Sequence, residues 1–308
     1  MMELFIHYTT LPEGKKLEDI VEELNEVLED DGCVCGGADY EVGGRIDLEL
    51  EDEVKNPKFA QMSIKSYLQR ANFPRDTKVE FGCMEIGIYE KAMYRYVIFD
   101  LDGTLLNTLD DLADAGNYTC RLNGWPEHPL EAYKYFVGNG IPKLVERFTP
   151  EHLRTPEVLE KALGEFVPYY NAHKEDKTLP YPGISEALTR LKAAGVHMAV
   201  LTNKAHPLAR GVIECYFPGM FAFVQGALPD FPTKPDPTLL HRLMSDMGAQ
   251  PEDTLFVGDS NVDIRTAKNA KLKSCGVLWG FRTREELLCE GADHLAQTAQ
   301  ELAALILT

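Results

Sequence analysis

The chain lacks any apolar run that approaches the length of a membrane-spanning helix, and it is poor in positive charge. Lysine and arginine number 31 against 49 aspartates and glutamates, which gives a formal net charge of −18. Binding to a nucleic-acid backbone depends on basic patches, so this composition argues against a nucleic-acid partner. The first residues, Met1 to Ile6, contain no basic segment. We therefore expect a soluble, cytoplasmic protein with no membrane partner.

The cysteines do not form a recognisable framework. Seven are present, an odd number at irregular spacing, in a chain of 308 residues, so a set of disulfides is not expected. Cys33 and Cys35 are separated by one residue, but no second pair at ligand spacing follows them, and a metal site there is disfavoured. The length is sufficient for two domains, each with its own core.

Residues 1–92 have the pattern of a small α+β domain. Alternation over Leu4 to Tyr8 predicts a strand, and Lys16 to Leu28 places its apolar residues on one helical face. A second cycle follows, with strands over 38–42 and 45–50, a helix over 57–71 and a strand over 79–89. The order β-α-β-β-α-β predicts a ferredoxin-like arrangement.

This first domain is strongly acidic. It holds 21 acidic against 10 basic residues, which accounts for most of the excess negative charge of the chain. The run from Glu49 to Glu53 could bind a cation, but such runs are more often solvated edges that prevent strands of different molecules from pairing. We expect an interaction or regulatory role for this domain, self-association into a homo-oligomer included.

The second part of the chain begins with a buried strand that ends in two carboxylates. Tyr96 to Phe99 is apolar, Asp100 follows directly, and Asp102 comes one residue later beside Gly103. Two carboxylates this close repel each other unless a cation lies between them or one holds a proton. A magnesium-dependent phosphoryl-transfer site needs one carboxylate to attack phosphorus and another to move a proton. The alternative is a capped strand end, in which the side chains satisfy turn amides.

Three further segments follow in order. A buried strand over 197–201 ends in Thr202-Asn203-Lys204, and Lys234 is followed by Pro235 at the start of a predicted helix. A third apolar strand, from Leu255, runs into Asp259 and then Asp263. Open α/β sheets bind ligands at the carboxyl ends of their strands. Asp100, Thr202 and Asp259 therefore converge if their three strands are neighbours.

With these segments, residues from about 94 to 308 resemble the haloacid dehalogenase-like superfamily, and within it the phosphoglycolate phosphatases. The resemblance implies an α/β fold with a Rossmann-like parallel sheet over residues 93–308. It also implies that the helical stretch at about 109–179 is an inserted cap that closes over the active site.

The resemblance assigns roles to single residues. Asp100, Asp102 and Lys234 are the catalytic residues, with Asp100 as nucleophile, Asp102 as acid and base, and Lys234 neutralising charge on the phosphoryl oxygens. Thr202 and Asn203 bind the phosphoryl group.

The cofactor implied is Mg²⁺, because magnesium prefers oxygen ligands in an octahedron and keeps waters. Its ligands are Asp100, Asp259 and the backbone carbonyl of Asp102. Asp263 lies one turn further along and orients Lys234 or a metal-bound water.

Two more segments lie near the site in the related proteins. The resemblance places the loop with Gly138 and Asn139, followed by Lys143, at the substrate end of the cap, where glycines let backbone amides approach a small anion. A plain turn between helices is the alternative for that loop. Trp279 to Arg282 resembles a segment beside the site, and a structural loop is equally compatible with it.

The predicted function is Mg²⁺-dependent hydrolysis of a small phosphorylated metabolite through an aspartyl-phosphate, by an enzyme similar to phosphoglycolate phosphatase. Asp102 favours phosphate chemistry, because haloacid dehalogenases and phosphonatases lack an aspartate at that position. A sugar phosphomutase of the same superfamily shares both aspartates and remains an alternative. A catalytically silent binding scaffold is a second alternative, which the complete set of motif residues disfavours.

Overall fold

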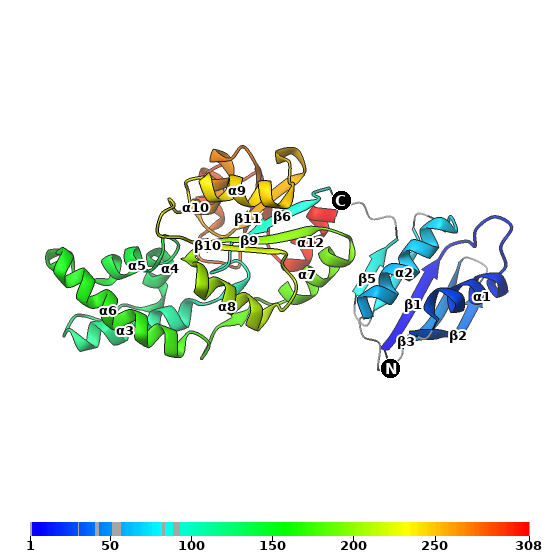
Figure 1. Cartoon of the computed structure of the whole chain (residues 1–308), viewed down its shortest axis with the longest axis horizontal. Coiled ribbons are helices and arrows are strands. Elements are labelled where there is room, and N and C mark those ends of the chain that lie inside the picture. Colours follow the sequence, from blue (N-terminus) through cyan, green and yellow to red (C-terminus); the bar gives the residue numbers. More distant parts are fainter. Residues whose placement is uncertain are drawn as a thin grey trace. The chain divides into compact units, whose positions relative to one another are not determined.

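The structure is a computed structural model that describes residues 2–29, 31–40, 43–50, 57–74, 76–81, 84–88 and 93–307. Contacts divide the chain into two compact units, one built mainly from residues up to 92 and the other from 93 to 306 (Figure 1). No helix among the described residues has the length and apolar character that crossing a membrane requires. The acidic residues 51–53 and the junction at 90–92 lie outside the described residues.

The first unit contains five strands and two helices in its described part. They are β1 (Met2–Tyr8), α1 (Leu17–Leu28), β2 (Gly32–Asp39), β3 (Gly44–Leu50), α2 (Pro57–Arg70), β4 (Lys78–Phe81) and β5 (Met84–Gly87). The sheet order is β2-β3-β1-β4-β5, and every neighbouring pair is antiparallel. The first four strands have the predicted ferredoxin-like order, to which β5 adds an edge.

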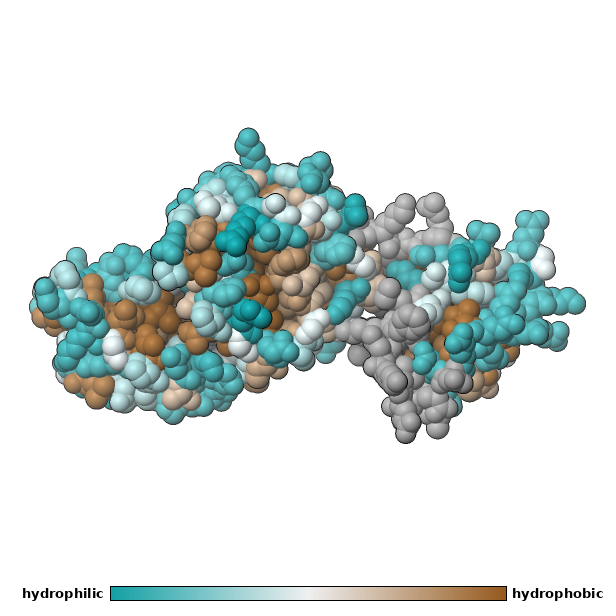
Figure 2. Space-filling view, in the orientation of Figure 1, coloured by the Kyte–Doolittle hydropathy of each residue, from teal (hydrophilic) through white to brown (hydrophobic). Residues whose placement is uncertain are grey.

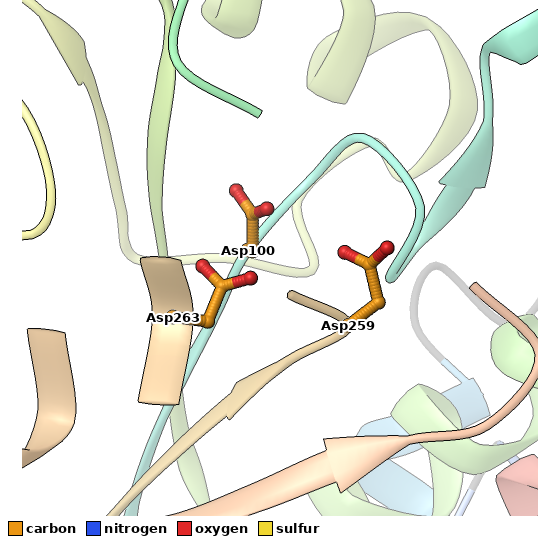
Figure 3. A group of neighbouring side chains, drawn as sticks. All are labelled: Asp100, Asp259 and Asp263. Carbon is orange, nitrogen blue, oxygen red and sulfur yellow. The ribbon is translucent and has the colours of Figure 1, made fainter. Parts of the chain in front are cut away.

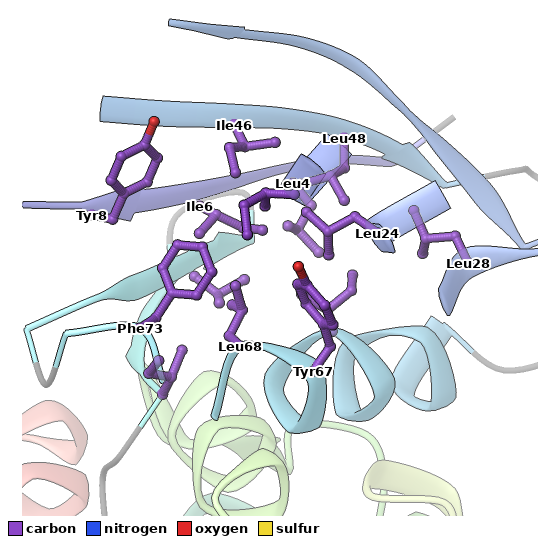
Figure 4. Packing of buried hydrophobic residues seen from close by; sticks show 14 of the residues in the cluster. Leu4, Ile6, Tyr8, Leu24, Leu28, Ile46, Leu48, Tyr67, Leu68 and Phe73 are labelled. Atoms are coloured by element: carbon purple, nitrogen blue, oxygen red, sulfur yellow. The ribbon is translucent and has the colours of Figure 1, made fainter. Parts of the chain in front are cut away.

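Alternate residues of the sheet form the core of this unit. Leu4 is paired with Leu48 and Ile6 with Ile46, and all four are buried against leucines of α1 and α2 (Figure 4). The exposed and buried faces thus follow the period of two that the sequence predicts.

Two strand predictions in this unit were wrong in extent. The strand expected over 38–42 begins at Gly32, because Cys33 and Val34 pair with β3 and only Cys35 is left out, as a bulge. The single strand expected over 79–89 is a hairpin of β4 and β5. The glycines of β2 make this strand hard to predict from the sequence, whereas pairing with β3 stabilises it in the structure.

The second unit has a parallel sheet of six strands. They are β6 (Tyr96–Phe99), β9 (His197–Ala205), β10 (Phe223–Ala227), β11 (Thr254–Gly258), β12 (Lys273–Val277) and β13 (His294–Ala296). The order is β10-β9-β6-β11-β12-β13, with all neighbours parallel. The α/β class and the Rossmann-like sheet are confirmed.

Five helices connect these strands, and a sixth follows the last strand. They are α7 (Ile184–Ala193), α8 (His206–Tyr216), α9 (Thr238–Met247), α10 (Asn261–Asn269), α11 (Arg284–Cys289) and α12 (Ala299–Leu307). β6 and β11 are buried almost throughout, as strands covered on both faces must be.

The chain between β6 and β9 contains four helices that form a cap. They are α3 (Leu109–Leu122), α4 (Leu130–Phe136), α5 (Ile141–Phe148) and α6 (Pro156–His173). The cap has its own buried cluster, in which Tyr133, Phe148 and Phe166 are the largest side chains. Its two connections to the sheet pair with each other as β7 (Leu106–Asn107) and β8 (Leu179–Pro180).

Candidate active site

The predicted site residues meet where three neighbouring strands end. β6 lies between β9 and β11, and the backbone amide of Asp100 donates to the carbonyl of Val257 at 2.8 Å. Asp100 follows β6, Asp259 follows β11, and Thr202 lies near the end of β9. The parallel sheet thus brings together residues that are more than 150 positions apart.

The turn after Asp100 needs glycine. Gly103 has a φ of 89°, and a Cβ atom on it would lie 2.4 Å from Oδ2 of Asp259. Gly280 approaches the same carboxylate from the other side, where an added Cβ would lie 2.2 Å from the Asp259 Cβ. Two backbone segments therefore fix the position of Asp259.

Asp100, Asp259 and Asp263 form a buried acidic cluster (Figure 3). One carboxylate oxygen from each lies within 4.8 Å of the others. Burial and the charge of Asp263 raise the pKa of Asp100 to about 7, and burial with the charges of both neighbours raises that of Asp259. Lys234 places one positive charge beside Asp100 and Asp263, and three carboxylates this close remain unfavourable without a further cation among their oxygens.

The cluster fits a divalent cation. The Oδ1 atom of Asp100 is buried and accepts no well-directed hydrogen bond from the described residues, although it lies 2.8 Å from Lys234 Nζ as an ion pair. Oxygen ligands from carboxylates are the ones that Mg²⁺ prefers. Asp100 and Asp259 thus have oxygens suited to a metal.

Both carboxylate oxygens of Asp263 already contact other groups of the protein. Its Oδ1 lies 2.7 Å from Lys234 Nζ, and its Oδ2 accepts hydrogen bonds from the backbone amide and the hydroxyl of Ser260. Lys234 bridges Asp263 and Asp100, and these two carboxylates raise its pKa against the opposing effect of burial. Asp263 therefore contacts Lys234, which is compatible with the first of the two roles predicted from the sequence, orienting Lys234 or a metal-bound water.

Asn203 connects the sheet to the cap. Its Oδ1 accepts from the Lys234 amide at 2.8 Å, and its Nδ2 donates to the carbonyls of Lys234 and Gly138 at 3.1 and 3.0 Å. The Asn203 side chain is thus engaged in holding the Lys234 backbone and the cap loop. Thr202, which accepts from the amide of Lys204, is buried at the same strand end.

Asp102 has a partner that sequence reasoning did not identify. Lys204 Nζ lies 3.0 Å from Asp102 Oδ1 and donates to the hydroxyl of Tyr170, on α6 of the cap, at 2.7 Å. Both Lys204 and Tyr170 are buried. The sequence indicates Lys204 only as part of its motif, because a lysine at a strand end is usually exposed and nothing local indicates its distant partners.

The cap loop is only partly at the site. Gly138 reaches Asn203, and Asn139 accepts a hydrogen bond from Arg147 at 2.8 Å. The side chain of Lys143 is 45% exposed and pairs with Glu146 at 2.7 Å. Lys143 lines a cleft together with Asn139 and Asn203, and none of the predicted carboxylates lines that cleft.

This cleft has a volume of about 910 Å³, and Asn139 and Gly140 of the loop form part of its wall. It is bordered by α5, α6 and the start of α8, and its walls include Ile141, Leu163 and Pro207. Figure 2 shows apolar side chains gathered over the cap helices. None of the acidic residues of the site lines this cleft.

The segment from Trp279 to Arg282 belongs to the site. The amide of Phe281 donates to Asp259 Oδ2 at 2.7 Å, and Trp279 Nε1 donates to the carbonyl of Thr104 at 3.0 Å. The ring of Phe281 packs into the cap cluster, while Arg282 donates to the carbonyl of Lys134 at the end of α4. One short loop thus contacts both a predicted metal ligand and the cap.

Comparison with known proteins agrees with this geometry. Residues 97–277 match the family model described as haloacid dehalogenase-like hydrolase. The phosphoglycolate phosphatase of Pseudomonas putida is 35% identical over 201 residues, covering 63% of this chain and 73% of that protein. The phosphoglycolate phosphatase of Vibrio vulnificus is 32% identical over 220 residues, covering 69% of this chain and 96% of that protein.

Solved structures show the same similarity. One from Lactobacillus delbrueckii subsp. bulgaricus, with a provisional phosphoglycolate phosphatase name, is 32% identical with a TM-score of 0.67 and covers 70% of this chain and 99% of its own. CbbY from Rhodobacter sphaeroides, solved with phosphate, is 24% identical with a TM-score of 0.59, covering 68% and 96% of the two chains. The second comparison shows similarity of fold.

Proposed function

Because the chain belongs to the haloacid dehalogenase-like hydrolases and is a phosphatase, we propose that it hydrolyses the phosphomonoester of a small phosphorylated metabolite. Phosphoglycolate is the first candidate, since the relatives from Pseudomonas and Vibrio carry it in their names. A small substrate also suits the site, in which Asp100, Asp259, Asp263 and both lysines are buried.

The observation that carries this proposal is the different surroundings of the two aspartates on one turn. Asp100 lies within the acidic cluster and against Lys234, whereas Asp102 is paired with Lys204 at the cap. Carboxylates held in different environments are suited to different roles in acid and base chemistry. Asp100 therefore serves as the nucleophile and Asp102 as the proton carrier.

The reaction has two displacements. A carboxylate oxygen of Asp100 attacks phosphorus, the bond to the ester oxygen breaks, and Asp102 gives its proton to the departing alcohol. Asp102 then takes a proton from a water that attacks the aspartyl-phosphate, which releases phosphate and restores Asp100. Lys234 stabilises the charge that develops on the phosphoryl oxygens.

The metal in this proposal is Mg²⁺. Asp100, Asp259 and the carbonyl of Asp102 would hold it, and when bound it supplies positive charge to the carboxylates and the phosphoryl oxygens. Asp259 is kept in place by Gly103, Gly280 and the Phe281 amide. The cytoplasmic location suggested by the sequence stays a prediction, which cell fractionation would test.

The direct test is a panel of phosphate esters that includes phosphoglycolate, hexose phosphates and an aryl phosphate. We expect release of phosphate with Mg²⁺, loss of turnover in excess chelator, and no rescue by Ca²⁺, which takes more oxygen ligands at longer distances. Full activity in excess chelator would contradict the metal. Conversion of a sugar phosphate into an isomer that keeps its phosphate would indicate the phosphomutase instead.

A further inference from the structure

The buried site contains two lysines, and they lie on different sides of it. Lys234 contacts Asp100 and Asp263, on the side of the nucleophile. Lys204 contacts Asp102, on the side where the alcohol departs if Asp102 is the acid. One lysine suffices for the phosphoryl oxygens, so the second needs a separate explanation.

Lys204 is unusual in its burial. Its side chain is 3% exposed, and its ammonium lies between Asp102 of the sheet and the hydroxyl of Tyr170 of the cap. The ammonium group also lies 5.1 Å from the centre of the Tyr170 ring. A buried ammonium is costly unless it is paired, and the attraction of Asp102 and Tyr170 raises the pKa of Lys204 above its ordinary value despite that burial.

One of the three contacts of the Lys204 ammonium is long. Its N–H groups face the Tyr170 hydroxyl at 2.7 Å and Asp102 Oδ1 at 3.0 Å, whereas Asp102 Oδ2 lies at 3.4 Å, so the N–H group on the Oδ2 side is the one that a ligand can take over. The other cations beside the cap loop donate to cap groups, namely Arg282 to the Lys134 and Val137 carbonyls, Arg147 to the Tyr135 and Phe136 carbonyls, and Lys143 to Glu146. Lys204 is thus the cation that lies directly beside Asp102, on the leaving-group side, and its long contact to Asp102 Oδ2 can be exchanged for a contact to an anion.

We propose that Lys204 and Tyr170 bind an anionic group of the departing alcohol and so select short phosphorylated hydroxy acids. The ester oxygen must come within hydrogen-bond reach of Asp102 to receive its proton, and Lys204 Nζ lies 3.0 Å from that carboxylate. A carboxylate one carbon away from the ester therefore falls within reach of the ammonium, where a charge-assisted hydrogen bond fixes it. This inference rests on the proposed function.

The competing explanation is that Lys204 only holds Asp102 in place. The two explanations predict different effects of Lys204 on the hydrolysis of different substrates. A lysine that positions Asp102 serves every ester equally, whereas a lysine that binds the alcohol serves only esters with an anionic group. The ratio of kcat/KM for two matched substrates therefore separates them.

The matched substrates are 2-phosphoglycolate and ethyl phosphate, which have the same length and differ in the carboxylate. We expect the unaltered enzyme to prefer 2-phosphoglycolate strongly, and Lys204→Met to lower this preference by roughly tenfold to a hundredfold. Tyr170→Phe keeps the ring that stacks on Phe166 and should lower the preference by only about threefold. Circular dichroism and thermal unfolding show whether each variant is folded.

Lys161→Met is the control, because Lys161 lies on α6, the helix of Tyr170, and its side chain is 64% exposed; this substitution should leave the preference unchanged. An equal loss on both substrates in Lys204→Met would overturn the inference and leave the proposed function standing. If the unaltered enzyme hydrolyses both esters equally well, this result alone would overturn the inference and leave the proposed function standing. No hydrolysis of any phosphate ester would instead refute the proposed function.

Discussion

Asp100 and Asp102 are two residues apart on one turn, and the structure gives each its own cation. Lys234 forms an ion pair with Asp263, which keeps its ammonium beside the nucleophile. Lys204 forms an ion pair with Asp102. The main chain at Lys234 is in turn fixed by Asn203. Each carboxylate is therefore positioned by side chains that come from another strand or loop.

Substituting each aspartate should separate their roles. With an aryl phosphate, whose leaving group needs no proton, Asp102→Asn should still allow attack by Asp100 but not the activation of water. One equivalent of product should then appear in a burst before turnover stalls. Asp100→Asn lacks the nucleophile and should show neither burst nor turnover. Rapid-quench measurements with Mg²⁺ present decide this, and a burst from Asp100→Asn alone would reverse the assignment.

The acidic cluster also predicts how stability depends on pH without metal. The pKa of Asp100 is raised from 3.8 to about 7, so between these values the folded state binds the proton and the unfolded state does not. Its contribution to the free energy of unfolding is therefore present below about pH 4 and lost as the pH rises through about 7. Added Mg²⁺ should raise the melting temperature more at pH 8 than at pH 5.

Denaturant unfolding of chelator-treated protein across this pH range provides the measurement. Asp100→Asn cannot ionise at this position, so its stability should fall less steeply with pH than that of the unaltered protein. Identical pH profiles for the two proteins would show that Asp100 does not titrate as described.

The residues that could be predicted from the sequence are those whose signal is local. Asp100 and Asp259 each follow an apolar strand directly, and parallel strands place such residues at one edge. Lys204 and Tyr170 could not be predicted, because their meeting depends on how α6 lies over β9. The loop at Gly280 could be noted by resemblance, but its close approach to Asp259 is visible only in three dimensions.

At the scale of elements, one buried carboxylate joins the cap to its second connection. Asp111 on α3 accepts hydrogen bonds from the amides of Lys177 and Thr178 and from the Thr178 hydroxyl. Thr178 immediately precedes β8, and its carbonyl accepts from Tyr216 of α8. Asp111 and Thr178 therefore link the start of the cap to its end and to α8.

Replacing Asp111 by alanine should lower the free energy of unfolding by roughly 2 to 4 kcal/mol, because it leaves buried donors without an acceptor. Asp114→Ala is the control. Asp114 lies on the same helix and pairs with Lys177, but half of its side chain is exposed, so its loss should cost less than about 1 kcal/mol. Urea unfolding of both variants compares them, and equal losses would mean that Asp111 has no special role.

The helices and strands differ in how well they could be predicted. The cap helices follow the period of the apolar residues, and the predicted helical stretch contains all four. β2 could not be placed correctly, since its three glycines have low strand propensity and the strand depends on pairing with β3. The extra edge strand β5 depends likewise on pairing, here with β4.

At the scale of the whole molecule, every residue assigned to the reaction lies in the second unit. A shortened chain that begins near Glu90 should therefore fold cooperatively and hydrolyse an aryl phosphate with kcat within about threefold of that of the full chain. Thermal unfolding and a phosphate-release assay test this. A shortened chain that fails to fold would show that the first unit supplies part of the second unit's core.

The position of β6 in the sheet has a consequence for how the chain acquires its structure during synthesis. β6 is a central strand, yet its partners β9 and β11 leave the ribosome only about a hundred and about 160 residues later. The described strands of the first unit, all within its first 88 residues, pair only among themselves and can finish folding earlier. The strand that carries the nucleophile is therefore unpaired while the entire cap is translated. Assembly of the catalytic centre is the late, slow step in the folding of a newly synthesised chain.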